Sequence, residues 1–361
     1  MFFNQTVEQL EADICASDGL FSALTSNLML VCHIFLLLLI LASFIASCCT
    51  FQLLADHTIF SDCATVILHS AMLNGIIHQA TLAIIRIQAI HHAVVYSKDK
   101  CSIQFHSSQC FYYNFVYYVT NIFSACSLLS LFLDRIFSFR LRSFYSSHQY
   151  AFAVVFIVLK AVGSFLLIFY TLPKSAYVGY VPMCYYPPQP VLVTFYYVSE
   201  IRIWGIVGML CASVFILYLN SKRENTIIHH TFDTESRYQS YENLQTSKAV
   251  CLIMLVQILC LGPTSLGSML LHRYELMMPE SVFHLLMSFM AGTTYAHFFL
   301  PLIIYFSVVR ILNSRAKALR LSTERTLNNF DDHFASLDQA WGSEKQRASE
   351  MVYDKNLFII G

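Results

Sequence analysis

Seven long apolar stretches dominate the sequence and restrict the chain to one class of fold. Each has about 20 residues or more, enough for a helix to cross the hydrocarbon core of a bilayer, which is about 30 Å thick. Because 57% of the 361 residues are hydrophobic and only 12% are charged, a soluble fold would expose too much apolar surface to water. The sequence therefore predicts an all-α membrane protein, a bundle of seven transmembrane helices. The expected spans are residues 28–54, 64–85, 111–133, 151–172, 191–219, 249–271 and 281–309.

The positions of lysine and arginine predict which way the bundle faces. Cytoplasmic loops carry an excess of these residues. With the N-terminus outside, the cytoplasmic segments contain 15 of them and the external segments contain five, with Arg86 counted in the second loop. We therefore expect an external N-terminus (residues 1–27), a seven-helix domain (28–309) and a cytoplasmic region (310–361). Asn4, in the sequence Asn-Gln-Thr, is an N-glycosylation acceptor that agrees with an external N-terminus.

The cytoplasmic region is expected to begin with an amphipathic helix. From Arg310 to Leu321 basic residues alternate with apolar ones, a pattern typical of helices that lie on an anionic membrane surface. The polar residues that follow, up to Gly361, are expected to be flexible. The loop Ser221–Ser247, before the sixth span, is expected to extend both flanking helices.

Charge and motifs argue against two other classes of protein. The 22 basic and 22 acidic residues give a net charge of zero, so a nucleic-acid partner is not expected. The sequence has no nucleophile elbow, phosphate loop or metal-ligand spacing, so we expect neither an enzyme nor a cofactor. His69 and His78 lie nine residues apart on one span and therefore face opposite sides, which disfavours a shared metal ion.

Four cysteines fall on the external side of this topology, where disulfides form. Cys110 begins the third span and Cys184 lies in the loop after the fourth. A bridge between them would hold that loop across the mouth of the bundle. Cys15 and Cys101 would then form a second bridge from the N-terminus to the second loop. Four cysteines allow three pairings, so spacing alone leaves the connectivity open.

The inner end of the third span carries an acid–base pair, Asp134-Arg135. Arg135 lies 25 residues beyond Cys110, about 37 Å along a helix, which is a full membrane crossing. Such a pair can act as a latch in which the arginine is held by the acid and released when helices shift. The alternative is a boundary arginine that extends to the lipid headgroups.

These features together resemble the G-protein-coupled receptors. Asp134-Arg135-Ile136 is similar to the Asp-Arg-Tyr motif, with isoleucine in third place. Cys260-Leu261-Gly262-Pro263 looks like Cys-Trp-x-Pro, and the segment from Pro301 to Tyr305 resembles Asn-Pro-x-x-Tyr without its asparagine and with the tyrosine one place late. The departures argue against an amine or peptide receptor of the main class. The resemblance implies a heterotrimeric G protein as partner and switch roles for Asp134, Arg135, Pro263, Pro301 and Tyr305.

A closer resemblance is to the nematode serpentine chemoreceptors of the Sra superfamily, class alpha or alpha/beta. Cys15-Ala16-Ser17 before the first span resembles that family's N-terminal pattern. The stretch from Ser236 to Leu244 is similar to its Arg-Tyr-Gln-x-x-Glu-Asn signature, and the tail from His333 to Trp341 is of the same type. The resemblance implies a plasma-membrane receptor for environmental chemicals, expressed in sensory neurons and placed in their cilia.

Ionisable residues inside the spans are the candidates for ligand binding, because charges in a membrane are costly. Lys160, near the middle of the fourth span, could face an acidic ligand or pair with Glu200. Glu200 and Arg202 are two residues apart and point in different directions; we expect Glu200 in an outer vestibule and Arg202 extending to the headgroups. Tyr117 belongs to a group of external aromatic residues, most of them expected in the interface belt and a few in an aromatic pocket.

The leading hypothesis is a chemosensory receptor that binds an external small molecule among the spans and signals to a G protein. The rival is a seven-span ion channel or transporter, for which Lys160, Glu200 and the membrane histidines would form an ion or proton path. The external cysteines and the basic inner loops favour the receptor. The sequence alone identifies neither the ligand nor a dimer partner.

Overall fold

A computed structural model describes residues 15–56, 59–230, 234–274, 277–290, 292–317 and 320. The chain divides into two compact units, Met1–Val308 and Val309–Gly361. The glycosylation acceptor Asn4 and the tail from residue 321 onward lie outside the described residues. The helical bundle belongs to the first unit.

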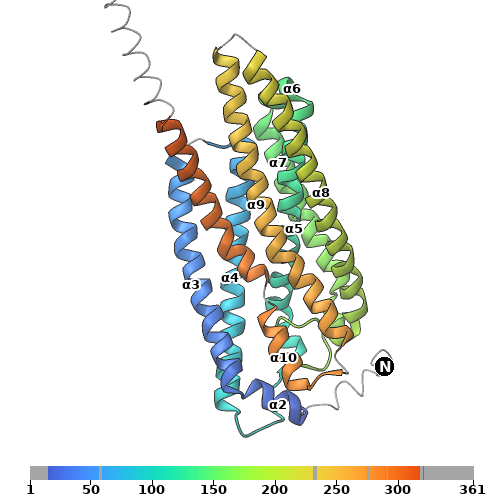
Figure 1. The fold of residues 1–361 in the computed structure, drawn as a ribbon. Helices are drawn as coiled ribbons and strands as arrows, with labels where there is room; N and C mark the ends of the chain where they lie inside the picture. The colour runs from blue at the N-terminus through green and yellow to red at the C-terminus, as the bar shows by residue number, and fades with distance from the viewer. Residues whose placement is uncertain are drawn as a thin grey trace, which may run out of the picture. The chain divides into compact units, whose positions relative to one another are not determined.

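The described part of this unit is almost entirely helical. Its long helices are α3 (Asn27–Asp56), α4 (Asp62–Val95), α5 (Phe111–Arg140), α7 (Gln149–Thr171), α8 (Leu192–His230) and α9 (Thr234–Arg273). The shorter helices are α2 (Asp18–Leu24), α6 (Arg142–Ser147) and α10 (Glu280–Phe289). In Figure 1 the long helices run side by side, with α2 and α10 at one end and α6 at the other. We call these the disulfide end, because both disulfides lie there, and the Asp134 end.

The predicted all-α membrane bundle is confirmed. Among the described residues, six helical segments are long and apolar enough to cross a membrane. Four lie in α3, α7, α8 and α9, and the other two are Ser107–Ser138, which includes most of α5, and Glu280–Lys317. The remaining long helix, α4, carries more polar residues. Asn74, His78 and Gln79 of α4 are all buried, so the polarity of this helix is directed into the bundle.

The α4 helix also corrects a prediction about Arg86. Arg86 was assigned to the second loop, but α4 continues to Val95 and the arginine is 1% exposed. The start of α4 is well defined, because Ser61 caps it by accepting a hydrogen bond from Ala64 N at 3.3 Å. Asp62 in the first turn suits the positive end of the helix dipole.

The α3 helix shows how the bundle sorts its residues. Leu38, Leu41 and Ile45 are exposed on the outer surface, whereas small polar residues face inward. Ser43 Oγ donates to His297 O at 3.0 Å and Thr50 Oγ1 donates to Pro301 O at 3.0 Å. Small side chains allow close helix contact and hydrogen-bond across the interface, as is common in membrane bundles.

The seventh expected span is interrupted, contrary to the prediction of one helix over 281–309. Helix α10 ends at Phe289, and a second helix covers residues 292–317. At the start of this second helix, a Cβ on Gly292 would overlap the side chain of Thr264 on α9. The glycine therefore permits the close approach to α9. In the second unit, residues 310–317 of the expected amphipathic segment are helical.

Helices α8 and α9 are much longer than a bilayer requires. With 39 and 40 residues, each is about 60 Å long, roughly twice the hydrocarbon thickness. Most of the segment 221–247 is therefore helical, as expected for extensions of the flanking spans.

The disulfide end is covered by short elements. Strand β1 (Phe105–His106) pairs antiparallel with β2 (Tyr180–Val181). Leu20 and Leu24 of α2 are buried in one apolar cluster with Phe105 and Val181. Ser17 Oγ, at the start of α2, donates to Glu280 Oε2 of α10 at 2.6 Å. Residues 16–24 are thus part of the folded bundle.

Candidate functional site

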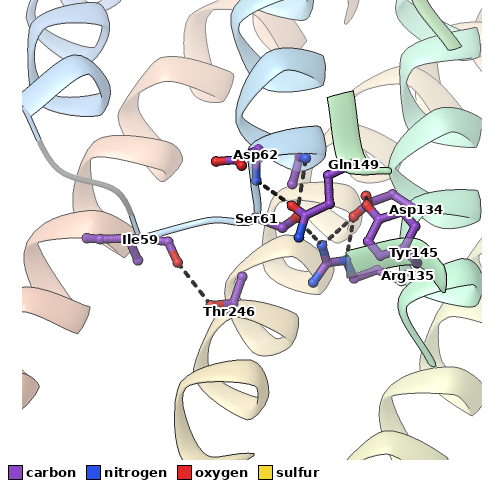
Figure 2. Close-up of polar contacts among 9 residues, drawn as sticks. Ile59, Ser61, Asp62, Asp134, Arg135, Tyr145, Gln149 and Thr246 are labelled. Carbon is purple, nitrogen blue, oxygen red and sulfur yellow. Dashed lines mark hydrogen bonds and ion pairs between the residues drawn. The ribbon is translucent and has the colours of Figure 1, made fainter. Parts of the chain in front are cut away.

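The Asp134 end holds a buried ion pair near the end of α5. Asp134 is 0% exposed and Arg135 is 8% exposed. Arg135 Nε donates to Asp134 Oδ2 at 2.8 Å, and Tyr145 OH of α6 donates to Oδ1 of the same carboxylate. Figure 2 shows the tyrosine and the arginine approaching the carboxylate together. The buried negative charge is thereby both paired and hydrogen-bonded.

Arg135 is also bound to the start of α4. Its Nη2 donates to Ser61 Oγ at 2.9 Å, the same oxygen that caps α4 (Figure 2). Two neighbouring contacts hold this region: Asp62 N donates to Gln149 Oε1 at 2.9 Å, and Thr246 Oγ1 of α9 donates to Ile59 O at 3.2 Å. Arg135 therefore connects α5 to the start of α4. Helices α7 and α9 contact the same segment, residues 59–62.

Tyr145 is fixed as a donor in this cluster. Burial, and secondarily the negative charge of Asp134, raise the pKa of the Tyr145 hydroxyl. A phenol with a raised pKa keeps its proton, so Tyr145 donates to the carboxylate across the physiological pH range. Tyr145 thus helps Arg135 hold the charge of Asp134.

A small cavity that opens to the outside lies beside Arg135, with about 280 Å³ of empty space including its open part. Phe132 and Arg135 of α5, Leu217 of α8, and Cys251 and Met254 of α9 line it. The arginine is thus next to unfilled space between the three helices, and its present partners keep it bound to Asp134 and Ser61.

At the opposite end, two disulfides shape the mouth of the bundle. Cys110 is bonded to Cys184 and Cys15 to Cys101. Two further bonds hold the residues after Cys184: Asn114 Nδ2 donates to Tyr186 O at 2.6 Å and Tyr118 OH donates to Tyr185 O at 2.8 Å. The loop between α7 and α8 is therefore attached along the first turns of α5.

A cavity that opens to the outside lies below this loop, with about 700 Å³ of empty space including its open part. Residues from α5, the loop, α8, α9 and α10 contribute to its walls, among them Tyr117, Tyr185, Arg202, Met269 and Met287. A second cavity, with about 420 Å³ of empty space including its open part, is lined mainly by residues of α5, α7 and α8. Aromatic and apolar walls with a few polar groups are typical of small-molecule sites.

Comparison with protein families decides what kind of protein contains this site. Residues 10–341 match the family described as "Serpentine type 7TM GPCR chemoreceptor Sra". The chain belongs to the Sra family. Three Caenorhabditis elegans proteins illustrate the relationship. Serpentine receptor class alpha-29 is 41% identical over 92% of this chain and 96% of its own length. Serpentine receptors class alpha-31 and alpha-28 are 38% and 37% identical, over 92% and 91% of this chain and 97% and 96% of their own lengths.

The family confirms the resemblance inferred from the sequence. The Sra chain is a multi-pass membrane protein of a chemoreceptor family rather than of an enzyme family. All three relatives are named as class alpha.

The position of Lys160 in the Sra receptor differs from the expected one. Its side chain is 3% exposed and lines none of the three cavities. Lys160 Nζ donates to Ser70 Oγ at 2.6 Å and Ser127 Oγ at 3.3 Å, and lies 4.5 Å from the centroid of the Phe123 ring. Among the described residues no carboxylate pairs with it, and Glu200 is exposed elsewhere. Lys160 is therefore a helix-packing residue in this structure.

Replacing Lys160 by methionine is expected to raise the melting temperature of the solubilised receptor. A buried ammonium without a carboxylate partner costs desolvation energy, whereas methionine fills a similar volume without charge. Thermal unfolding in detergent would measure the change. Lys160→Ala, which leaves a void, is the control and should melt below Lys160→Met. A Lys160→Met variant that unfolds well below wild type would contradict this interpretation.

Glu200 and Arg202 of α8 do not lie where they were expected. Glu200 is exposed on the outside of the helix, whereas Arg202 points into the bundle and lines both cavities at the disulfide end. The spacing of the two residues correctly predicts different directions, but Arg202 and not Glu200 reaches the cavity. Tyr117 also lines the larger cavity. The centroid of its ring lies 4.9 Å from that of the His78 ring.

Some of the residues with expected switch roles are buried in the bundle, and others lie on its surface. Asp134 and Arg135 are buried together, and Pro301 O accepts a hydrogen bond from Thr50. Pro263 lies inside α9 on an exposed face. Tyr305 is 39% exposed on the outer surface, because its one-place shift turns it by about 100° around the helix. The switch role that the resemblance implies for Tyr305 therefore stays a prediction.

Sequence reasoning missed Ser61, Tyr145 and Arg86. Ser61 carried a signal, since a serine before an aspartate at the start of a span is typical of a helix cap. Tyr145 had none, because its contact with Asp134 depends on the turn between α5 and α6.

Proposed function

We propose that this Sra receptor detects a small molecule in the cavity at the disulfide end and signals through a heterotrimeric G protein at the Asp134 end. In this proposal the N-terminus and the disulfides are extracellular, and the Asp134 end is cytoplasmic. The receptor resides in the plasma membrane, in the cilia of sensory neurons, and Asn4 is accessible for glycosylation.

The observation that carries the proposal is the arrangement of sites along α5. Tyr117 and Tyr118 of this helix line the larger cavity, and Asp134-Arg135 lies near its other end. Helices α8 and α9 also contribute to the larger cavity and to the one beside Arg135. A ligand that shifts these helices can therefore change the space around Arg135, provided it binds the two arrangements with different affinity.

Arg135→Gln is expected to abolish ligand-evoked signalling, because Arg135 would contact the G protein once it leaves Asp134. The measurement is a dose–response curve in cells that express the receptor with a promiscuous G protein, normalised to the amount of receptor at the cell surface. An unchanged maximal response would contradict the proposed role.

A double variant, Asp134→Asn with Arg135→Gln, controls for folding. It removes both charges of the pair, so neither remains buried without a partner. The double variant should reach the cell surface at least as well as Arg135→Gln but remain silent. Recovered signalling would show that Arg135 acts only through folding.

A further inference from the structure

Arg202 is a positive charge inside the bundle without a negative partner among the described residues. Its Nη1 donates to Asn121 Oδ1 at 3.0 Å and its Nη2 to Ser265 Oγ at 2.5 Å, both neutral acceptors. Its Nε is buried and makes no hydrogen bond. Since a guanidinium has five N–H donors, part of its hydrogen-bonding capacity is unused.

A positive charge without a counter-charge is costly inside the bundle, and in this respect Arg202 differs from Arg135 at the Asp134 end. Arg135 has the carboxylate of Asp134 beside it, whereas the charge of Arg202 is not compensated. Charged side chains within a membrane bundle are expensive and generally occur with a partner or a functional role. The unused donors of Arg202 fit an anion that the chain itself does not supply.

The space for such an anion lies next to the guanidinium. The two cavities at the disulfide end share four lining residues: Tyr118, Asn121, Ser199 and Arg202. Beyond them the smaller cavity is apolar, with Ile122, Ile168 and Leu172 in its walls. A charged group placed at Arg202 would therefore have an apolar space beside it. Lys160 offers no such space, because it lines neither cavity.

A second cation strengthens the positive field around the larger cavity. Arg86 is 1% exposed, donates to His33 Nδ1 at 2.9 Å and to Ser288 O at 3.2 Å, and lies 5.0 Å from the ring centroid of Tyr185, which lines the cavity. These partners are neutral acceptors and an aromatic ring. Buried charges act strongly on their surroundings, because they are little screened.

We propose that the ligand of this receptor is an amphipathic organic carboxylate, bound through its carboxylate to Arg202 and with its apolar chain in the adjoining cavity. This inference rests on the proposed chemoreceptor function, which it makes more specific. The planar guanidinium matches a carboxylate in a two-point contact. Water-soluble short acids and membrane-borne fatty acids share this chemistry.

A binding experiment on the full-length solubilised receptor tests the proposal without a G protein. Octanoate should raise its melting temperature as concentration increases, whereas methyl octanoate and octylamine at equal concentrations should not. A series from butanoate to dodecanoate would separate the two sources, since a soluble acid favours the short members and a fatty acid the long ones. Equal stabilisation by the ester, or no shift across the whole series, would overturn the proposal.

Arg202→Gln is the decisive variant. The apparent affinity for the best carboxylate should fall about 10- to 100-fold, the usual effect of losing hydrogen bonds to a charged group. Its melting temperature without ligand should equal or exceed that of wild type, because a partly buried charge without a counter-charge is removed. The matched control is Glu200→Gln, an exposed change two residues away, which should bind as wild type. Unchanged affinity in Arg202→Gln would overturn the proposal.

A further variant keeps the test valid if Arg202→Gln fails to fold. Arg202→Lys retains the charge, so it should still prefer octanoate to its methyl ester, with lower affinity than wild type. A lysine variant without this preference would overturn the proposal. Carboxylate binding without cellular signalling would contradict G-protein coupling and leave the ligand class standing. Signalling to neutral compounds, without any preference for carboxylates, would contradict the ligand class and leave G-protein coupling standing.

Discussion

Replacing Asp134 by asparagine is expected to reduce the free energy of unfolding of the receptor by about 3–5 kcal/mol, the typical cost of removing one partner of a buried ion pair. Asparagine has nearly the same shape, so the effect is electrostatic. Arg135 would remain 8% exposed without its counter-charge, and Tyr145 would donate to a neutral amide. Thermal unfolding of the solubilised variant against wild type measures the loss.

Two variants make this prediction specific to the ion pair. Tyr145→Phe removes one hydrogen bond to the carboxylate but no charge, so its loss should be smaller, about 1.5–3 kcal/mol. Adding Arg135→Gln to Asp134→Asn should recover part of the stability, since no unpaired charge is left. The prediction fails if Asp134→Asn unfolds like wild type or if the double variant is less stable than both single ones.

In cells, Asp134→Asn should also raise signalling in the absence of ligand, if the proposed function is right. The carboxylate is the strongest partner of Arg135 in the structure, and Ser61 alone would then hold it. The measurement is basal G-protein activity per receptor at the cell surface. Basal activity equal to that of wild type would contradict the proposed latch.

Removing the Cys110–Cys184 bridge is expected to have the second large effect. The two cysteines are 74 residues apart, and a disulfide that closes a loop of this size contributes about 2–4 kcal/mol. The bridge also holds Tyr185 and Tyr186 beside the cavity. The double variant Cys110→Ser, Cys184→Ser should therefore lose both thermal stability and ligand affinity.

The other disulfide provides a matched comparison. Cys15–Cys101 closes a loop of similar length, with a separation of 86, but neither cysteine adjoins a residue of the larger cavity. Cys15→Ser, Cys101→Ser should lose comparable stability and retain most of its affinity in the same melting and binding measurements. Equal losses of affinity in both double variants would show that the bridges act only through general stability.

Features that depend on local composition could be predicted from the sequence, and features that depend on packing could not. The spans follow from hydropathy, because lipid contact requires apolar side chains whatever the neighbouring helix is. The end of α10 at Phe289 could not be predicted, because it depends on tertiary packing, such as the close approach of Gly292 to Thr264 of α9. The fold class was therefore accessible from sequence, but the detailed course of the seventh span was not.

The candidate site shows the same division. Helical geometry predicts that Glu200 and Arg202 point apart, but which of them faces inward depends on the rotation of α8 against its neighbours. Arg86 was assigned to a loop because charge near the end of an apolar stretch usually marks a boundary. His33 of α3 and the backbone of Ser288 accept its hydrogen bonds inside the bundle, and neither partner is near it in sequence.

The length of α9 has a mechanical consequence. Pro263 lies 29 residues from the first residue of the helix, Thr234, which corresponds to about 44 Å. A change of only about 5° in the helix axis at the proline, the position where such helices commonly bend, displaces the far end by about 4 Å. In the proposed function, a bend at Pro263, next to the cavity residue Thr264, would therefore be amplified along the helix. In the proposed function, a ligand that moved the cavity wall by a fraction of an ångström would displace the far end of α9 by about the size of a side chain.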